Sequence, residues 1–310
     1  MIVCMEKKFC LNLSEFLLYY QNVKLTVIQP GGNHGDSLIY KGLQKKLNQL
    51  NIDYKEILYG KNIISFCIMM VNKLLRTNFK SVFIEKDTGL ILIHGGGNMN
   101  DIYNFGTTLL RNLIINYPKI DLIIAPQTYY YPHTNFKKIL TKSSQNITLF
   151  CREETSFNYL RNLQLPKNVK IKISDDTAFY LKSTDFKSGD NKNILIVFRN
   201  DSEKNNEISI AKAKLLEQYK PKNLIINDFQ NSKKFTFDEY ITEILKAKIV
   251  ITDRLHVSII SSILGKKTYL FPNSYFKNIA VYNYSLRFFP DTHMVNPHDI
   301  DDILYQLSKS

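Results

Sequence analysis

Residues 248–271 read KIVITDRLHVSIISSILGKKTYLF. A continuous apolar run ends at Thr252, and apolar residues then recur every three or four positions until Gly265. This change of period predicts a strand followed by a helix, and glycine is a good helix stop. The apolar run TYLF then predicts a second strand. Because a strand–helix–strand unit joins parallel strands, the stretch predicts a parallel sheet.

The same alternation recurs along the chain. Apolar runs followed by turn residues and a helical pattern are KLTVIQ, GLILI, DLIIA, ITLF and VKIKI in the first half, and NILIVF, NLIIN, KIVIT and TYLF in the second. Continuous apolar strands are typical of parallel sheets covered by helices on both faces. We therefore predict an α/β fold with two Rossmann-like domains facing across a cleft, residues 1–182 and 193–310, joined by a polar linker at 183–192.

The composition indicates a globular chain without nucleic-acid partners. The 310 residues are 44% hydrophobic and 22% charged, and the net charge of +13 comes mostly from lysines spread thinly along the chain, as on a solvated surface. The four cysteines lack CxxC spacing, which predicts free thiols. Glu15 interrupts the apolar run near the N-terminus, where no cleavage site follows, so we expect a cytoplasmic protein.

The segment NIISFCIMMVNKLLR, residues 62–76, is the most apolar of the chain. It falls short of the roughly 18 to 20 apolar residues that span a bilayer. Two interpretations remain: an ordinary core helix, which the pattern favours, and a helix lying on a membrane surface. The second would place the protein on the inner face of the cytoplasmic membrane.

The stretch QPGGNHGDSLIYKGL, residues 29–43, follows the first predicted strand. Its glycines allow close approach of the backbone, and Asp36 and Ser37 are predicted to cap a helix beginning near Leu38. The spacing is not GxGxxG, which argues against a dinucleotide cofactor. The predictions are an anion or sugar hydroxyls at the helix start, with Asn33, Gly35 and Asp36 as candidates, or simply a tight turn.

The stretch LIHGGGNMND, residues 92–101, contains three consecutive glycines after a strand. Each ordered glycine costs about 0.5 to 1 kcal/mol relative to alanine, so something must require that backbone. We predict a ligand cradle, with these candidates: Gly95, Gly96, Gly97, Asn98 and Asp101.

Three of the seven arginines, Arg152, Arg199 and Arg254, follow predicted strands. The planar guanidinium fork suits a phosphate or carboxylate, which predicts an anion site. The other explanation is ion pairing with neighbouring acids: Glu153, Glu154 or Asp201. The stretch SDDTAF, residues 174–179, adds paired carboxylates, which can act as acid and base when their pKa values separate.

In the stretch quoted first, Asp253 is predicted at the N-cap, which places Arg254 and His256 in the first helical turn. The backbone N–H groups and the helix dipole favour an anion there, and a histidine can move a proton near neutral pH. Walker A, HExxH and GxSxG motifs and metal-spaced Cys/His clusters are absent from the sequence, so no metal is expected.

The order of motifs GGNHGD, HGGGN, CREETS, DDTAF, FR and TDRLHVSI resembles the polysaccharide pyruvyl transferase family over residues 24–285. The resemblance implies a GT-B-like fold, phosphoenolpyruvate as donor and a pyruvyl ketal as product. The acceptor would be a sugar of a bacterial capsular, surface or exopolysaccharide, or its lipid-linked precursor. By the family's pattern, Arg254, His256 and Arg152 would face phosphoenolpyruvate, and the N-terminal half would shape the acceptor site.

This resemblance leads to a hypothesis about roles. His256 would move the proton, Arg254 and Arg152 would hold the donor, and Asp36 or Asp176 would be the other acid or base. Two alternatives remain: a GT-B glycosyltransferase that uses a nucleotide sugar, and a non-catalytic protein that binds polyanions or membranes. The C-terminal half lacks the glutamate pair of many such glycosyltransferases, and a basic binding module does not need glycine-rich strand ends.

Overall fold

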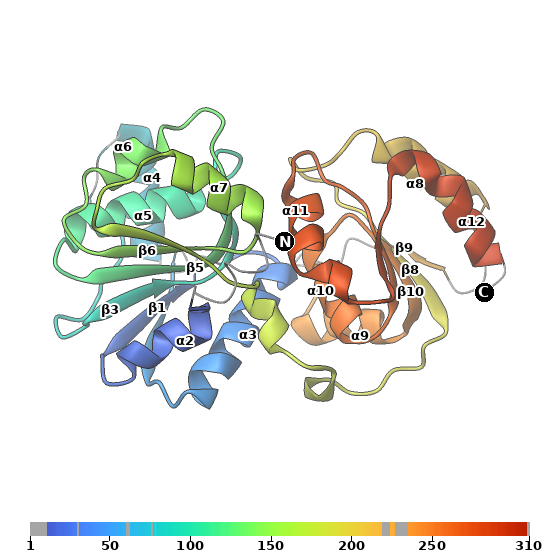
Figure 1. Ribbon diagram of the computed structural model, residues 1–310, viewed down its shortest axis with the longest axis horizontal. Helices are drawn as coiled ribbons and strands as arrows, with labels where there is room; N and C mark the ends of the chain where they lie inside the picture. The colour runs from blue at the N-terminus through green and yellow to red at the C-terminus, as the bar shows by residue number, and fades with distance from the viewer. Residues whose placement is uncertain are drawn as a thin grey trace. The chain divides into compact units, whose positions relative to one another are not determined.

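The computed structural model describes residues 11–29, 31–59, 63–75, 77, 79–218, 224–226 and 235–308. They divide into two compact units (Figure 1). The first comprises the described residues up to Gly31 together with Ile39–Tyr180, and the second comprises Gly32–Leu38 together with the described residues from Leu181 onward. The GGNHGD motif therefore belongs mainly to the second unit.

The first unit is built on a parallel sheet with strand order β2-β1-β3-β5-β6-β7, and β4 pairs with β5 beyond the end of β3. Its strands are β1 (Leu25–Gln29), β2 (Tyr54–Leu58), β3 (Leu90–Ile93), β4 (Gly96–Asn100), β5 (Asp121–Tyr130), β6 (Ile147–Cys151) and β7 (Val169–Ile173).

Helices cover both faces of this sheet (Figure 1). On one face lie α2 (Leu13–Leu17) and residues 39–49 of α3 (His34–Gln49), and on the other lie α5 (Phe105–Asn116), α6 (Phe136–Leu140) and α7 (Glu154–Asn162). Along β3, Leu90 and Leu92 pack in the core beneath the first pair, whereas Ile91 and Ile93 pack beneath the other three. Both faces of the strand are therefore buried, as its continuous apolar sequence predicts.

The second unit has a five-stranded parallel sheet of order β12-β11-β10-β8-β9. Its strands are β8 (Asn193–Val197), β9 (Leu224–Ile226), β10 (Ala247–Thr252), β11 (Lys267–Leu270) and β12 (Thr292–Met294). On one face lie α8 (Ile208–Gln218) and α12 (Ile300–Ser308), and on the other lie α9 (Phe237–Leu245) and α10 (Leu255–Ile263) (Figure 1). The helix α11 (Lys277–Tyr284) follows β11.

All nine predicted strands are present, but the sequence prediction missed β2, β4 and β12. The strand β2 is polar and partly exposed, and β12 has only three residues, so neither shows an apolar run. The strand β5 continues through Pro126, where a turn was predicted. Its pairing shifts register between Ile124 and Gln127, and such an irregularity accommodates a proline, which has no N–H to donate.

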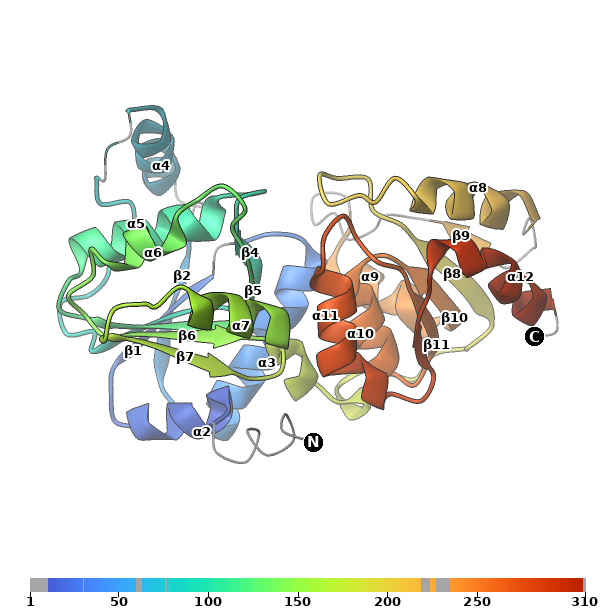
Figure 2. The same cartoon turned by 45° about the horizontal axis from the view of Figure 1, so that its top comes forward.

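The helix α4 (Ile63–Leu75) corrects one expectation. The sequence pattern favours a core helix here over a helix on a membrane surface, yet Leu74 and Leu75 are 82% and 62% exposed, and Phe66, Met70 and Val71 are exposed as well. Figure 2 shows α4 outside α5 and α6, on the side away from the sheet. Within the described part of the chain, no helix has the length and apolar character needed to cross a membrane.

Candidate functional site

The carboxyl ends of β8 and β10 bring together three predicted site residues of the second unit. The strands are parallel neighbours, with Val197 opposite Thr252, whose Oγ1 donates a hydrogen bond to the Val197 carbonyl. Just past these strand ends, the backbone N–H of Arg199 donates a hydrogen bond to Asp253 Oδ1 at 2.7 Å. Arg254 follows directly, so Arg199, Asp253 and Arg254 lie at one edge of the sheet.

The two guanidinium groups converge on Asp201. Its carboxylate accepts hydrogen bonds from Arg199 Nε at 2.9 Å and from Arg254 Nη1 at 2.7 Å. Glu203 pairs with Arg199 and with Lys277 from α11. Ion pairing with Asp201, the alternative explanation for Arg199, is thus observed, but both arginines are buried rather than on the surface.

Burial sets the electrostatics of this cluster. Desolvation raises the pKa of the buried Asp253 carboxyl to about 6 despite its hydrogen bond from Arg199. Desolvation also acts on Glu203, but the opposing charges of Lys277 and Arg199 outweigh it and hold the pKa of Glu203 below its ordinary value. Sequence reasoning did not single out Glu203 or Lys277, because only the fold places them beside Arg199.

The start of α10 differs from the prediction. Asp253 was expected at the N-cap, but Arg254 occupies the N-cap and the helix begins at Leu255. The Asp253 carboxylate is turned instead to the backbone N–H of Arg199. The Arg254 side chain makes no capping hydrogen bond, so the N-cap supplies no acceptor for the backbone N–H groups of the first turn. Such a helix start can offer N–H groups to an anion.

The GGNHGD segment also starts its helix earlier than predicted. The helix α3 begins at His34, not near Leu38, because Asn33 and Asp36 cap it reciprocally. Asn33 Oδ1 accepts from the Gly35 N–H at 2.7 Å, and Asp36 Oδ2 accepts from the Asn33 N–H at 3.0 Å. A Cβ on Gly32 would stand 1.8 Å from Asp36 Oδ2, so this cap requires glycine there.

Gly35 lies against His256. A Cβ built on Gly35 would stand only 2.6 Å from His256 Nδ1, although 221 positions separate the two residues in sequence. His34 anchors the same segment, because its Nε2 lies 2.7 Å from the Phe235 carbonyl oxygen and its ring stacks on Tyr240. The second unit therefore gathers the starts of α3 and α10 around His256, which is partly buried.

The triple-glycine motif lies in the first unit and has packing reasons of its own. A Cβ on Gly95 would stand 2.6 Å from the Pro126 carbonyl oxygen, so close packing on β5 requires that glycine. Gly96 has a φ of +130°, a backbone conformation that residues with a side chain rarely adopt. Asp101 Oδ2 accepts hydrogen bonds from the backbone N–H groups of His133 and Thr134, which fixes the loop after β5. Gly97 and Asn98 are partly exposed, and a ligand role for the motif stays a prediction.

Arg152 and Asp176 form an ion pair inside the first unit. Arg152 Nη1 lies 2.7 Å from Asp176 Oδ2, and the two side chains are 1% and 0% exposed. Arg152 Nε also donates to Thr128 Oγ1. The sequence hypothesis gave these residues separate roles, donor binding and proton transfer, whereas the structure pairs them with each other. Among the described residues, no group of three or more His, Cys, Asp or Glu side chains is placed to hold a metal ion.

Comparison with known proteins identifies the family. The model of the polysaccharide pyruvyl transferase family matches residues 33–275, which include Gly35, Arg199, Arg254 and His256. The chain belongs to this family. The pyruvyl transferase 1 of Schizosaccharomyces pombe is 24% identical over 281 residues, covering 81% of this chain. The chain spans 66% of the length of that relative.

Solved structures show the same architecture. An uncharacterized protein from Klebsiella pneumoniae is 28% identical, with a TM-score of 0.61 and coverage of 94% of this chain and 98% of its own. The UDP-GlcNAc 2-epimerase of Methanocaldococcus jannaschii, in complex with UDP-GlcNAc and UDP, is 12% identical, with a TM-score of 0.52 and 92% of each chain covered. The fold is therefore GT-B-like, as predicted.

Proposed function

We propose that the protein transfers pyruvate from phosphoenolpyruvate to two hydroxyls of a sugar, forming a pyruvyl ketal and releasing phosphate. The observation that carries this proposal is the position of His256 in the first turn of α10, against Gly35 and two residues after the buried Arg254. The donor carries a phosphate and a carboxylate, which suit a helix start beside two guanidinium groups.

In the proposed reaction, His256 protonates the methylene carbon of phosphoenolpyruvate, which leaves an oxocarbenium-like centre at the neighbouring carbon. One sugar hydroxyl attacks that carbon and the bond to phosphate breaks. A second hydroxyl then closes the ketal. The two hydroxyl protons balance the proton gained by carbon and the one carried away by phosphate. No metal takes part in these steps.

Arg254 and Arg199 would bind the donor's anionic groups in place of Asp201, the carboxylate that now accepts hydrogen bonds from both. Asp253 would position Arg199 through its backbone N–H rather than touch the donor. Asp36 caps α3 by accepting a hydrogen bond from the Asn33 N–H. If its carboxyl also acts as the acid or base, it would do so while it accepts that hydrogen bond. Arg152 and Asp176 would support the first unit through their buried pair.

The acceptor we propose is a sugar of a bacterial capsular, surface or exopolysaccharide, or its lipid-linked precursor, modified in the cytoplasm at the membrane's inner face. Gly97 and Asn98 of the first unit would contribute to its binding. The acceptor is best found by mass spectrometry of candidate glycans incubated with phosphoenolpyruvate, looking for an added pyruvyl group.

The test of the function is phosphate release from phosphoenolpyruvate in the presence of such a glycan. Replacing Arg254 with glutamine should lower kcat by about 100-fold or more, because it removes a fixed cation beside the leaving phosphate. His256→Ala should abolish release, while the exposed His298 serves as the control for an alanine substitution. Normal release by His256→Ala contradicts its role.

A second measurement separates the donor classes. Phosphoenolpyruvate at 100 times its dissociation constant should stabilise the protein by about 2.7 kcal/mol against unfolding, with no such effect from UDP-GlcNAc. Stabilisation by the nucleotide sugar alone would instead support the glycosyltransferase alternative.

A further inference from the structure

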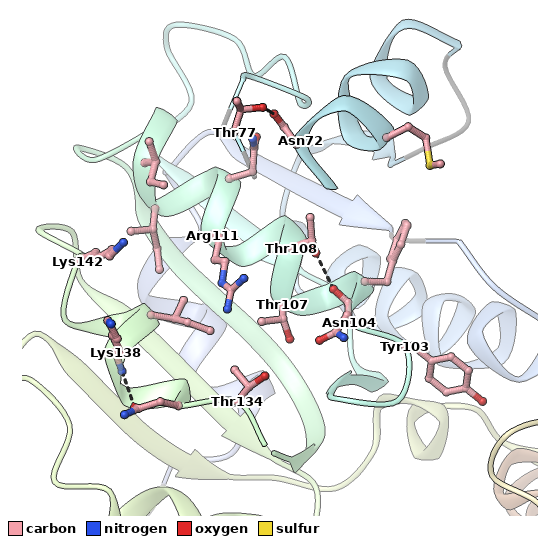
Figure 3. A pocket seen from close by; sticks show the side chains of 17 residues that line it. Asn72, Thr77, Tyr103, Asn104, Thr107, Thr108, Arg111, Thr134, Lys138 and Lys142 are labelled. Atoms are coloured by element: carbon pink, nitrogen blue, oxygen red, sulfur yellow. Dashed lines mark hydrogen bonds between the residues drawn. The ribbon is translucent and has the colours of Figure 1, made fainter. Parts of the chain in front are cut away.

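The first unit contains a groove that the proposed reaction does not use. It has a volume of about 750 Å³ and is lined by residues of α4, α5 and α6 and of the loops next to them (Figure 3). We call it the α4–α5–α6 groove. None of the predicted site residues lines it, so its chemistry needs a separate explanation.

The side chains that line the groove include basic residues and no acidic ones. Arg111 of α5, Lys138 of α6 and Lys142 line it, and the lining contains no aspartate or glutamate. Figure 3 shows the guanidinium group of Arg111 pointing into the space between α5 and α6. All three cations are exposed, and none forms an ion pair with another residue that the structure describes. Such a concave cationic surface favours an anionic group such as a phosphate.

Directly beside the groove, α4 presents an apolar face to solvent. Its exposed large side chains are those of Phe66, Met70, Val71, Leu74 and Leu75, and Met70 also lines the groove. Phe79 and Phe83 in the following segment are 58% and 61% exposed. A helix of 13 residues is about 20 Å long, too short to span a bilayer but long enough to lie in its surface.

Hydrogen bonds hold the segment after α4 against α5. Asn72 Nδ2 of α4 and Asn112 Nδ2 of α5 both donate to the Phe79 carbonyl oxygen at 2.7 Å, and the Ser81 N–H donates to Asn112 Oδ1. These hydrogen bonds connect α4 to α5 and therefore hold the apolar face of α4 next to the cationic groove. Residues 57–84 also contain no acidic residue and four basic ones.

We propose that this surface docks on an anionic phospholipid leaflet. The apolar face of α4 enters the boundary between headgroups and acyl chains, and Arg111, Lys138 and Lys142 bind a headgroup phosphate in the groove. A soluble anion would leave the apolar face exposed, and a second copy of this chain would bring together two surfaces of the same positive charge. The inference does not depend on pyruvyl transfer, because lipid binding is measured without donor or acceptor.

The experiment is sedimentation of the full-length protein with vesicles of phosphatidylglycerol and phosphatidylcholine at low salt. We expect binding to these vesicles but not to pure phosphatidylcholine, and a steep loss of binding at high salt. The triple substitution Arg111→Gln, Lys138→Gln and Lys142→Gln should weaken binding about 100-fold, since each basic residue near an anionic surface contributes about tenfold or less.

The matched control replaces three other exposed lysines of the same unit with glutamine: Lys119, Lys167 and Lys170. It changes the net charge equally and should leave binding within about threefold of the unchanged protein. A loss as large as that of the groove variant means that the net charge, not the groove, attracts the vesicles, and overturns the proposal.

A second measurement leaves the groove intact. Cys67 on α4 is an exposed free thiol, whereas Cys151 is buried. With Cys4 and Cys10 replaced by serine, a polarity-sensitive dye on Cys67 should shift to shorter wavelength on phosphatidylglycerol vesicles and stay unchanged with inorganic phosphate. An unchanged dye on the vesicles, a shift with phosphate alone, or self-association that Leu74→Ser abolishes would each overturn the proposal.

Discussion

Replacing Gly35 with alanine perturbs His256 through a single added methyl group. The new Cβ would stand 2.6 Å from His256 Nδ1, whereas ordinary contact begins at about 3.4 Å, so the imidazole must move by about 0.8 Å. Displacing a reacting group by about 1 Å can cost about 100-fold in rate. We expect kcat/KM for phosphate release from phosphoenolpyruvate to fall by that order.

Stability should change far less than activity. Alanine is favoured over glycine inside a helix by about 0.5 to 1 kcal/mol. The same Cβ would also stand 2.9 Å from Asn33 Oδ1, and losing that capping contact costs about 1 kcal/mol. The two effects nearly cancel, so urea denaturation should show a free energy of unfolding within about 1 kcal/mol of the unchanged protein.

Gly89→Ala is the matched control. Its Cβ would stand 2.7 Å from Val23 Cγ1 in the first unit, which is an equally close contact that does not involve His256. The rate measured is that of phosphate release from phosphoenolpyruvate. The acceptor is the glycan that gains a pyruvyl group, in its unmodified form. A Gly35→Ala protein that folds and retains kcat/KM within about threefold would refute the placement of His256 or its part in the reaction.

Two further predictions concern buried carboxylates. Because burial raises the pKa of Asp253 to about 6, the unfolded chain releases this proton at lower pH than the folded chain; stability from this group should fall by roughly 3 kcal/mol between about pH 4 and pH 6. Asp253→Asn should remove that slope, and identical slopes in urea titrations of both proteins would contradict the burial argument. Asp176→Asn leaves the Arg152 charge buried without its counter-ion and should cost about 3 to 5 kcal/mol in unfolding free energy. Replacing both residues with methionine and leucine should cost less, and a loss below about 1 kcal/mol for Asp176→Asn would show that the pair is not needed.

The predictions that succeeded rest on local periodicity. The apolar runs at Leu25–Gln29 and Ala247–Thr252 are strands because continuous β-branched and aliphatic residues suit a sheet buried on both faces. Residues that directly follow neighbouring parallel strands must share an edge, and for this reason Arg199 and Arg254 meet. The edge strands β2 and β12 were missed because their sequences contain no apolar run. The first residues of α3 and α10 were misplaced because several neighbouring polar side chains can each cap a helix.

The apolar pattern of α4 shows the limit of periodicity. A sequence records that one side of a helix is apolar, but it does not record whether another element covers that side. The core-helix interpretation was therefore reasonable for residues 62–76 and wrong for Leu74 and Leu75. Asn62 and Arg76 at its ends lie outside the described residues, as do Cys4 and Cys10.

The parallel α/β architecture and the family motifs could be predicted from the residues alone, because both depend on short local patterns. Which distant residues meet depends on the tertiary structure: Gly35 with His256, Arg152 with Asp176, and Asp201 with two arginines. The physical reason is that contacts between residues far apart in the chain depend on strand order and on how closely two backbones approach. A glycine in the sequence indicates that another group approaches its backbone closely, but only the fold shows which group that is.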